Sequence, residues 1–138
     1  AAAGNYRWLG GRAHEATRRR IQRADLLIHA SRMEGGAHVI MEAVVSGTPV
    51  LASRIEGNVG MLGEEYEGYF PWGDAAALAE LIGRCRESQP WRHAGSGLLA
   101  RLAAQGRRRA PLFDPAVERD AVRRLAGDLL AGQPGAAP

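Results

Sequence analysis

Two glutamates, Glu34 and Glu42, lie eight positions apart and flank a turn of small residues and the start of a predicted helix. An apolar run at 26–28 precedes them, and a second one begins at Val50. Backbone N–H groups at a helix start point at the preceding turn, where they and the helix dipole favour a diphosphate. Carboxylates before and after that turn can accept hydrogen bonds from sugar hydroxyls on either side of the phosphates. The pattern therefore predicts a nucleotide-sugar site.

The elements that would position these glutamates alternate between strands and helices. The nearly all-apolar run at 25–30 indicates a strand buried on both sides, as in a parallel sheet. A helix is expected over 38–45, ended by Gly47 and Pro49, and the next strand over 50–52. Strand–helix–strand spacing of this kind predicts an α/β fold with right-handed crossovers.

The remaining elements are shorter or lie toward the two ends. We expect a strand at 6–9, a polar helix at 13–23, a helical turn at 58–62 and a strand at 69–70. Asp74 is the expected N-cap of one helix, a further helix spans 91–108, and Asp114 and Pro115 start the last one. The apolar face of that last helix consists of Val122, Leu125, Ala126, Leu129 and Leu130.

This order of motifs resembles the E-x7-E signature of GT-B glycosyltransferases, in the retaining family that includes glycogen and sucrose synthases. Four further segments match that family in order and spacing over residues 6–85: Trp8-Leu9-Gly10, Ala24-Asp25-Leu26, Gly47-Thr48-Pro49-Val50 and Gly73-Asp74. The resemblance implies a Rossmann-like parallel sheet with flanking helices, specifically the C-terminal portion of a GT-B donor domain.

The resemblance also implies roles for the site residues. Glu34 would be the catalytic residue, binding donor-sugar hydroxyls and stabilising positive charge at the anomeric carbon. Glu42 would bind the two ribose hydroxyls of the nucleotide; an acid early in a helix is otherwise explained by the helix dipole. The other expected donor-binding residues are Ser31, Arg32, Gly35, Gly36, Ala37, His38 and Val39.

Some of these positions have two readings. The wider family usually has phenylalanine, glycine and leucine where this chain has Gly36, Ala37 and His38. His38 either donates a hydrogen bond to the diphosphate or is simply a polar residue at a helix start. Arg32 and Arg54 either approach the ligand or are surface residues. Trp8, Trp72 and Trp91 are interpreted as packing residues, and His29 as a hydrogen-bonded residue of the sheet.

A narrower resemblance is to the selenosugar synthases of selenoneine biosynthesis. It is carried by Arg32-Met-Glu-Gly-Gly-Ala37, Ala52-Ser-Arg-Ile55, Gly60-Met-Leu-Gly63, Tyr69-Phe-Pro71 and Pro111-Leu-Phe-Asp-Pro115. It implies a UDP-sugar as donor, selenophosphate as acceptor, and no cofactor or metal. The alternatives are a nucleotide-sugar 2-epimerase of the same fold and an inert binding fragment of a larger enzyme.

Composition narrows the function classes further. The 138 residues include one cysteine, Cys85, and 18 basic residues, all of them arginine, with a net charge of +3. The short arginine runs lack interleaved aromatic residues, so nucleic-acid binding is not expected. No apolar run is long enough to span a membrane, and a single cysteine suits a bacterial cytoplasm.

The resemblance leads us to expect a partial enzyme. The family usually binds the diphosphate with an arginine–lysine pair upstream of the Trp8-Leu9-Gly10 position, and this chain has no lysine. We therefore expect a missing N-terminal acceptor domain, and a fragment inactive by itself. The expected division is a partial nucleotide-sugar domain at 1–113, a helix packed on it at 114–131 and a disordered tail at 132–138. An exposed sheet edge at 6–9 would invite dimer formation.

Overall fold

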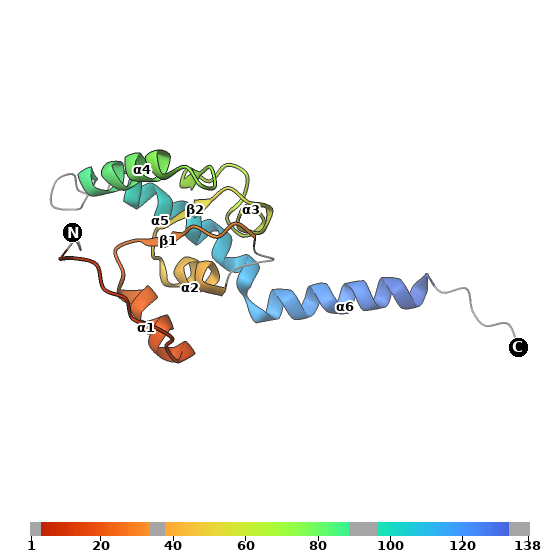
Figure 1. Cartoon of the computed structure of the whole chain (residues 1–138). Helices are drawn as coiled ribbons and strands as arrows, with labels where there is room; N and C mark the ends of the chain where they lie inside the picture. The colour runs from red at the N-terminus through yellow and green to blue at the C-terminus, as the bar shows by residue number, and fades with distance from the viewer. Residues whose placement is uncertain (1–3, 34–37, 89–96, 133–138) are drawn as a thin grey trace, which may run out of the picture.

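The computed structural model describes residues 4–33, 38–88 and 97–132. Figure 1 shows helices gathered around a small sheet, with one long helix projecting from it. The elements in chain order are α1 (His14–Arg23), β1 (Leu27–His29), α2 (His38–Ser46), β2 (Val50–Ser53), α3 (Glu56–Leu62), β3 (Tyr69–Phe70), α4 (Ala75–Glu87), α5 (Leu98–Arg109), η1 (Ala110–Phe113) and α6 (Pro115–Ala131).

The described sheet has three parallel strands in the order β1-β2-β3. Leu27 is paired with Val50, and Ala52 with Tyr69. All four residues of the central strand β2 are buried, which is what an uninterrupted apolar strand between two partners requires. The α/β class and the parallel sheet with flanking helices are thus confirmed.

The core lies between this sheet and helices α2, α4 and α5. From α2 come Ile40 and Val44, and from α5 comes Leu102; each is at most 1% exposed. Helix α4 contributes Leu81 and the only cysteine, Cys85, which is 3% exposed. Burial of a large aliphatic side chain contributes about 1.5–3 kcal/mol, so these residues hold the helices on the sheet.

Helix ends follow the sequence signals. Gly47, at φ +77°, ends α2 in the left-handed conformation expected of a residue just past a helix. The Asp74 carboxylate accepts a 2.9 Å hydrogen bond from the Ala77 amide at the start of α4, and Asp114 does the same for α6 through the Ala116 amide. The three local predictions are confirmed.

The Tyr66 side chain pairs with the backbone of β2 before β3 begins. Its hydroxyl accepts a hydrogen bond from the Val50 amide and donates one to the Val50 carbonyl. Val50 lies two residues before Ala52, the first residue of β2 that is paired with β3. Gly68 allows this, because a Cβ there would lie 2.5 Å from the Val50 oxygen and 2.6 Å from the Tyr66 ring. The Tyr66 ring is itself buried, so its hydroxyl pairs with the Val50 backbone inside the core.

The predicted strand at 6–9 is wrong, and so is the exposed sheet edge expected there. Residues 6–9 form no strand, and the side chains of Tyr6 and Trp8 are 76% and 80% exposed. Among the described residues β1 is therefore an edge strand, and Ile28 is 41% exposed. A short apolar segment becomes a strand only beside a partner edge, and the pattern of residues 6–9 does not itself specify one.

The last helix forms as predicted but does not pack as predicted. Figure 1 shows α6 extending away from the other elements, and none of its residues is buried. Leu125, Leu129 and Leu130 are 61–72% exposed. The short η1 turn directs the chain outward, so the apolar stripe of α6 faces no other apolar surface in the described part of the chain.

Candidate functional site

Several polar and aromatic residues follow the carboxyl ends of the strands, among them two predicted site residues, Ser31 and Arg32. These two come shortly after β1, Arg54 comes directly after β2 and Trp72 shortly after β3. Since the three strands are parallel, these ends lie along one edge of the sheet. In open α/β sheets this is the edge where ligands bind.

A buried polar cluster underlies this edge. Ser53, fully buried at the end of β2, donates a hydrogen bond from its hydroxyl to the Ser31 carbonyl at 2.5 Å. Asn58 of α3, also fully buried, donates from Nδ2 to the Ser53 carbonyl at 2.9 Å and lies 3.3 Å from the Ser53 hydroxyl. Three segments of the chain are thus tied together where the strands end.

His29 completes this cluster. It is 9% exposed, and its Nε2 lies 3.3 Å from the Ser31 hydroxyl. Its Nδ1 and the Asn58 Oδ1 are buried without a hydrogen-bond partner among the described residues. Unpaired buried polar atoms are uncommon because each carries a desolvation cost. The interpretation of His29 as a hydrogen-bonded residue of the sheet is confirmed.

Arginines at this edge lie over aromatic rings. The Arg32 guanidinium carbon is 5.1 Å from the centre of the Trp72 ring, and that of Arg54 is 5.1 Å from the Tyr69 ring. Arg54 also forms a 2.8 Å ion pair with Glu64. Trp72 is 52% exposed, so its interpretation as a packing residue is wrong, as it is for Trp8. Trp91 lies outside the described residues.

Helix α2 begins at His38, as predicted, with His38 exposed and Val39 partly buried. Glu42 follows one turn later. Its side chain is 16% exposed and is paired with Arg18 of α1, with Nε and Oε2 3.3 Å apart. The residues Glu34, Gly35, Gly36 and Ala37 lie outside the described residues, so their predicted roles stay predictions.

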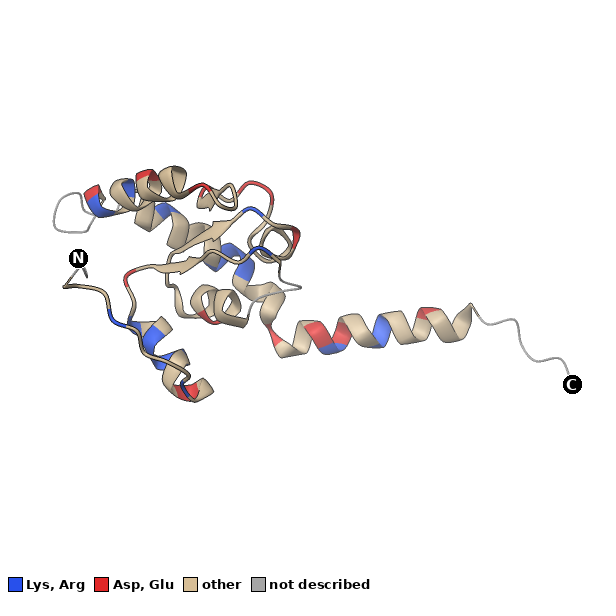
Figure 2. Ribbon diagram, in the orientation of Figure 1, with Lys and Arg blue, Asp and Glu red and all other residues tan. Residues whose placement is uncertain are grey.

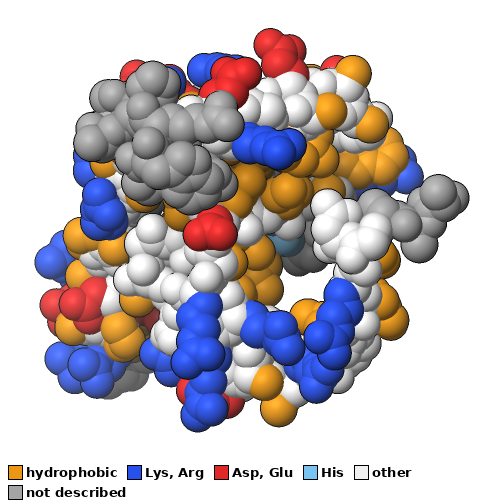
Figure 3. All heavy atoms as spheres, turned by 90° about the vertical axis from the view of Figure 1, so that its left-hand side faces the viewer, with side chains coloured by type: hydrophobic (Ala, Val, Ile, Leu, Met, Phe, Trp, Pro, Cys, Tyr) orange, Lys and Arg blue, Asp and Glu red, His pale blue; other side chains and the backbone are white. Residues whose placement is uncertain are grey.

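The arginines of α1 are partly neutralised by acids. Glu15 pairs with Arg18 at 4.0 Å and with Arg19 at 3.5 Å on the surface of the helix. Figure 2 marks several positions of the α1 ribbon as Lys or Arg, and Figure 3 shows basic side chains gathered over the lower part of one face of the molecule. Exposed pairs of this kind contribute about 0–1 kcal/mol each. We interpret this face as solvated and charged.

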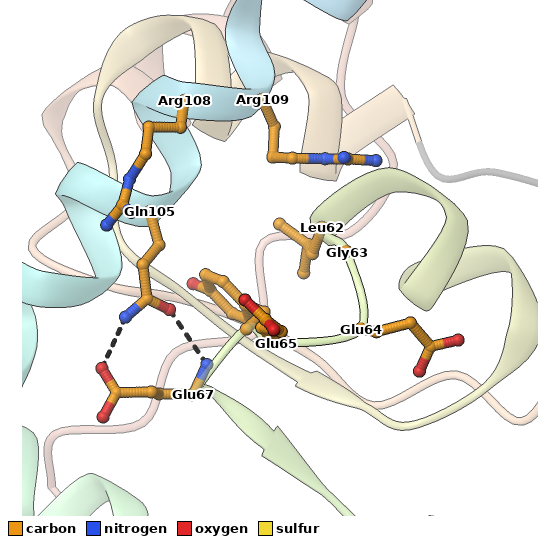
Figure 4. A pocket seen from close by; sticks show the side chains of 9 residues that line it. Leu62, Gly63, Glu64, Glu65, Glu67, Gln105, Arg108 and Arg109 are labelled. Carbon is orange, nitrogen blue, oxygen red and sulfur yellow. Dashed lines mark hydrogen bonds between the residues drawn. The ribbon is translucent and has the colours of Figure 1, made fainter.

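A cavity of about 460 Å³ lies elsewhere, between α5 and the acidic loop that leads into β3. Figure 4 shows Gln105 joined to Glu67 by two hydrogen bonds, with Arg108 and Arg109 above. The hydrogen bond from Gln105, with help from Arg101, holds the pKa of Glu67 below its usual range. The described residues that line this cavity do not include Ser31 or Arg32.

The described residues contain neither a cluster suited to holding a metal ion nor a helix suited to crossing a membrane. No group of three or more His, Cys, Asp or Glu is placed to hold a metal ion within residues 4–33, 38–88 and 97–132. In those same ranges, no helix combines the length and apolar character that crossing a bilayer requires.

A family model described as "Glycosyl transferases group 1" matches residues 2–108. The chain belongs to this family. The match spans the sheet, helices α1 to α4 and nearly all of α5, including both glutamates and the polar edge. A search of curated proteins finds no match to this chain. Membership means that the domain serves glycosyl transfer, with a nucleotide-sugar donor and an acceptor as substrates.

Two residues of the polar edge, Ser53 and Asn58, were not singled out as site residues by the sequence reasoning, and Trp72 was interpreted only as a packing residue. Ser53 and Asn58 are common polar residues, and nothing in their local pattern shows that both are fully buried. Trp72 follows a two-residue strand, which gives little signal of which way its side chain points. The available signal was positional: Ser53 ends an apolar strand, and residues at the carboxyl ends of parallel strands meet at one edge.

Proposed function

We propose that this chain is the donor-binding part of a longer glycosyltransferase that uses a UDP-sugar. The observation that carries the proposal is the family match over residues 2–108, which includes Glu34, Glu42 and the start of α2. The N–H groups at that helix start suit the diphosphate of the donor, because the first N–H groups of a helix have no intrahelical partner and lie at the positive end of its dipole.

The two glutamates would act at opposite ends of the donor. Glu34 would bind hydroxyls of the sugar, and its charge would stabilise the anomeric carbon as the bond to the diphosphate breaks. Glu42 would accept hydrogen bonds from the ribose. Its pairing with Arg18 supports this role, because the ion pair fixes the orientation of a carboxylate that is only 16% exposed.

The narrower proposal is a selenosugar synthase, with selenophosphate as acceptor. Selenium would form the new bond to the anomeric carbon, while the electron pair of the broken bond leaves with the nucleoside diphosphate. Several of the segments that resemble these enzymes lie at or beside the polar edge, among them those that contain Arg32, Arg54 and Pro71. The acceptor would be bound mainly by the expected N-terminal domain.

The test is transfer by the full-length enzyme. With a UDP-sugar and selenophosphate, we expect Glu34→Ala to lower kcat by about 100-fold or more, as loss of a transition-state contact does. Glu65→Ala, in the exposed loop before β3, should retain activity. Unchanged turnover in Glu34→Ala contradicts the assignment of Glu34. Nucleotide release that needs no acceptor would favour a 2-epimerase instead.

A further inference from the structure

A chain of hydrogen bonds connects α3 to the segment that follows β1. The Asn58 amide nitrogen lies 3.3 Å from the Ser53 hydroxyl, which in turn donates to the Ser31 carbonyl at 2.5 Å. Asn58 and Ser53 are fully buried. Because a serine hydroxyl carries one hydrogen and two lone pairs, Ser53 can accept from Asn58 while it donates to Ser31.

This chain begins where the main-chain ladder ends. The last pair of β1 and β2 is His29 with Ala52, and the next residue of β2 is Ser53. From there the Ser53 side chain takes over, reaching two residues beyond the end of β1 to the Ser31 carbonyl. A buried side chain thus contacts the backbone of Ser31 beyond the last residue pair of β1 and β2.

We propose that Ser53 and Asn58 are positioning residues for glycosyl transfer. They fix the backbone at Ser31, and through it the chain that carries Arg32 and leads, three residues on, to Glu34. This inference rests on the proposed function. A shift of the backbone at this point would misplace groups that must match the transition state, and misplacement lowers kcat more than it weakens donor binding.

The chain offers a matched control at the other end of the same strand. Thr48 is buried just before β2, and its hydroxyl donates to the Ile21 carbonyl at 2.8 Å. Ser53→Ala and Thr48→Val each remove one buried hydroxyl that donates to a backbone carbonyl, and the Ser53 hydroxyl also lies 3.4 Å from the His29 carbonyl. They differ in which end of the sheet they loosen, so a general loss of stability should appear in both variants.

The experiment compares kcat and donor KM in the full-length enzyme. We expect Ser53→Ala to lower kcat about tenfold or more with donor KM within about threefold of wild type. Thr48→Val should keep kcat within about twofold of wild type. Ser53→Cys, which retains a weak donor, should recover part of the loss. Equal kcat in Ser53→Ala and Thr48→Val, both folded, would overturn the proposal.

A second measurement separates this inference from the proposed function. In amide hydrogen exchange of the chain itself, Ser53→Ala and Asn58→Asp should speed exchange at Arg32 and Met33, whereas Thr48→Val should not. Unchanged exchange at these two amides would overturn the positioning role even in an active enzyme. Faster exchange in an enzyme without transfer activity would instead count against the proposed function alone.

Discussion

At the scale of single residues, Trp72 is the side chain whose environment differs most from expectation. Arg32 lies over its ring at 5.1 Å, and the ring is half exposed at the ligand-binding edge. An exposed cation–π contact is worth about 0.5–1 kcal/mol. Its value here would be to restrict Arg32, a predicted donor-binding residue, to one orientation before the anionic donor arrives.

We therefore predict that Trp72→Ala raises donor KM severalfold, whereas Trp72→Phe, which retains an aromatic face, does so less. Steady-state kinetics of the full-length enzyme provide the measurement. Trp8→Ala is the control, because Trp8 is 80% exposed and has no described contact with an arginine. A KM unchanged in Trp72→Ala would show that Arg32 does not depend on the ring.

Tyr66 gives a second prediction at this scale. Tyr66→Phe removes the hydroxyl that pairs with the Val50 amide and carbonyl. Leaving buried backbone groups unpaired costs about 1–3 kcal/mol, so the free energy of unfolding should fall by that amount in urea titrations at pH 7. The control is Tyr6→Phe, because the Tyr6 ring is 76% exposed.

The same tyrosines predict how stability depends on pH. Burial raises the pKa of Tyr66 well above its ordinary value, and burial raises the pKa of Tyr69 to about 12 despite the nearby Arg54 guanidinium. The folded state therefore favours the neutral phenols. This contribution is complete below about pH 10, the unfolded pKa, and is lost as pH rises through the folded values.

The free energy of unfolding should accordingly fall above about pH 10. Tyr66→Phe should show a smaller fall than wild type, because its contribution is gone at every pH. Burial also raises the pKa of the Cys85 thiol, but Cys85 is present in both proteins and so does not affect the difference. Parallel pH profiles for the two proteins would contradict this account.

At the scale of elements, α5 and α6 have opposite relations to the core. Leu102 of α5 is fully buried, whereas Leu129 of α6 is 65% exposed. Leu102→Ala should lower the free energy of unfolding by about 2–5 kcal/mol, the usual cost of a cavity in a packed core. Leu129→Ala should change it by no more than about 0.5 kcal/mol. Thermal and urea unfolding followed by circular dichroism would measure both.

If Leu129→Ala proved as destabilising as Leu102→Ala, α6 would have to pack on an apolar surface in solution. Figure 2 marks both basic and acidic residues along the ribbon of α6, so the helix is charged as well as apolar. The apolar face of α6 and its N-cap could be predicted from the sequence. Its position could not, because an apolar stripe specifies that a helix needs a partner without specifying which one.

The same distinction explains which other elements were predictable. Strand β2, helix α2 and the cap of α4 depend on local signals: an apolar run, a C-terminal glycine and an aspartate N-cap. The strand expected at 6–9 depended on a partner that local sequence does not encode. In the site, motif positions such as Arg32 and Glu42 were identified, whereas their contacts with Trp72 and Arg18 arise only from the tertiary fold.

At the scale of the whole molecule, the distribution of cations predicts weak donor binding by the isolated chain. At the ligand-binding edge Arg54 is paired with Glu64, and Arg18 with Glu42 on the neighbouring helix. The arginine–lysine pair that the family resemblance implies for the diphosphate is not part of the sequence. Without that pair, the helix-start N–H groups and Arg32 would have to neutralise the phosphates.

Calorimetric titration of the chain with UDP should therefore give a dissociation constant weaker than about 1 mM, or less than about 4 kcal/mol of binding free energy. An enzyme that also carries the arginine–lysine pair expected from the family resemblance should bind at least about tenfold more tightly. Low-micromolar binding by the chain alone would contradict this view and would make the described edge sufficient for the donor.

The burial of Cys85 has a consequence for following the motions of the protein. It is the only cysteine in the chain, and it lies on the inner face of α4 with 3% of its surface exposed. A thiol reagent can reach it only when α4 separates from the sheet and α5. The rate at which the native protein is labelled would thus time one local opening event, with no engineered probe and no second thiol to confuse the signal.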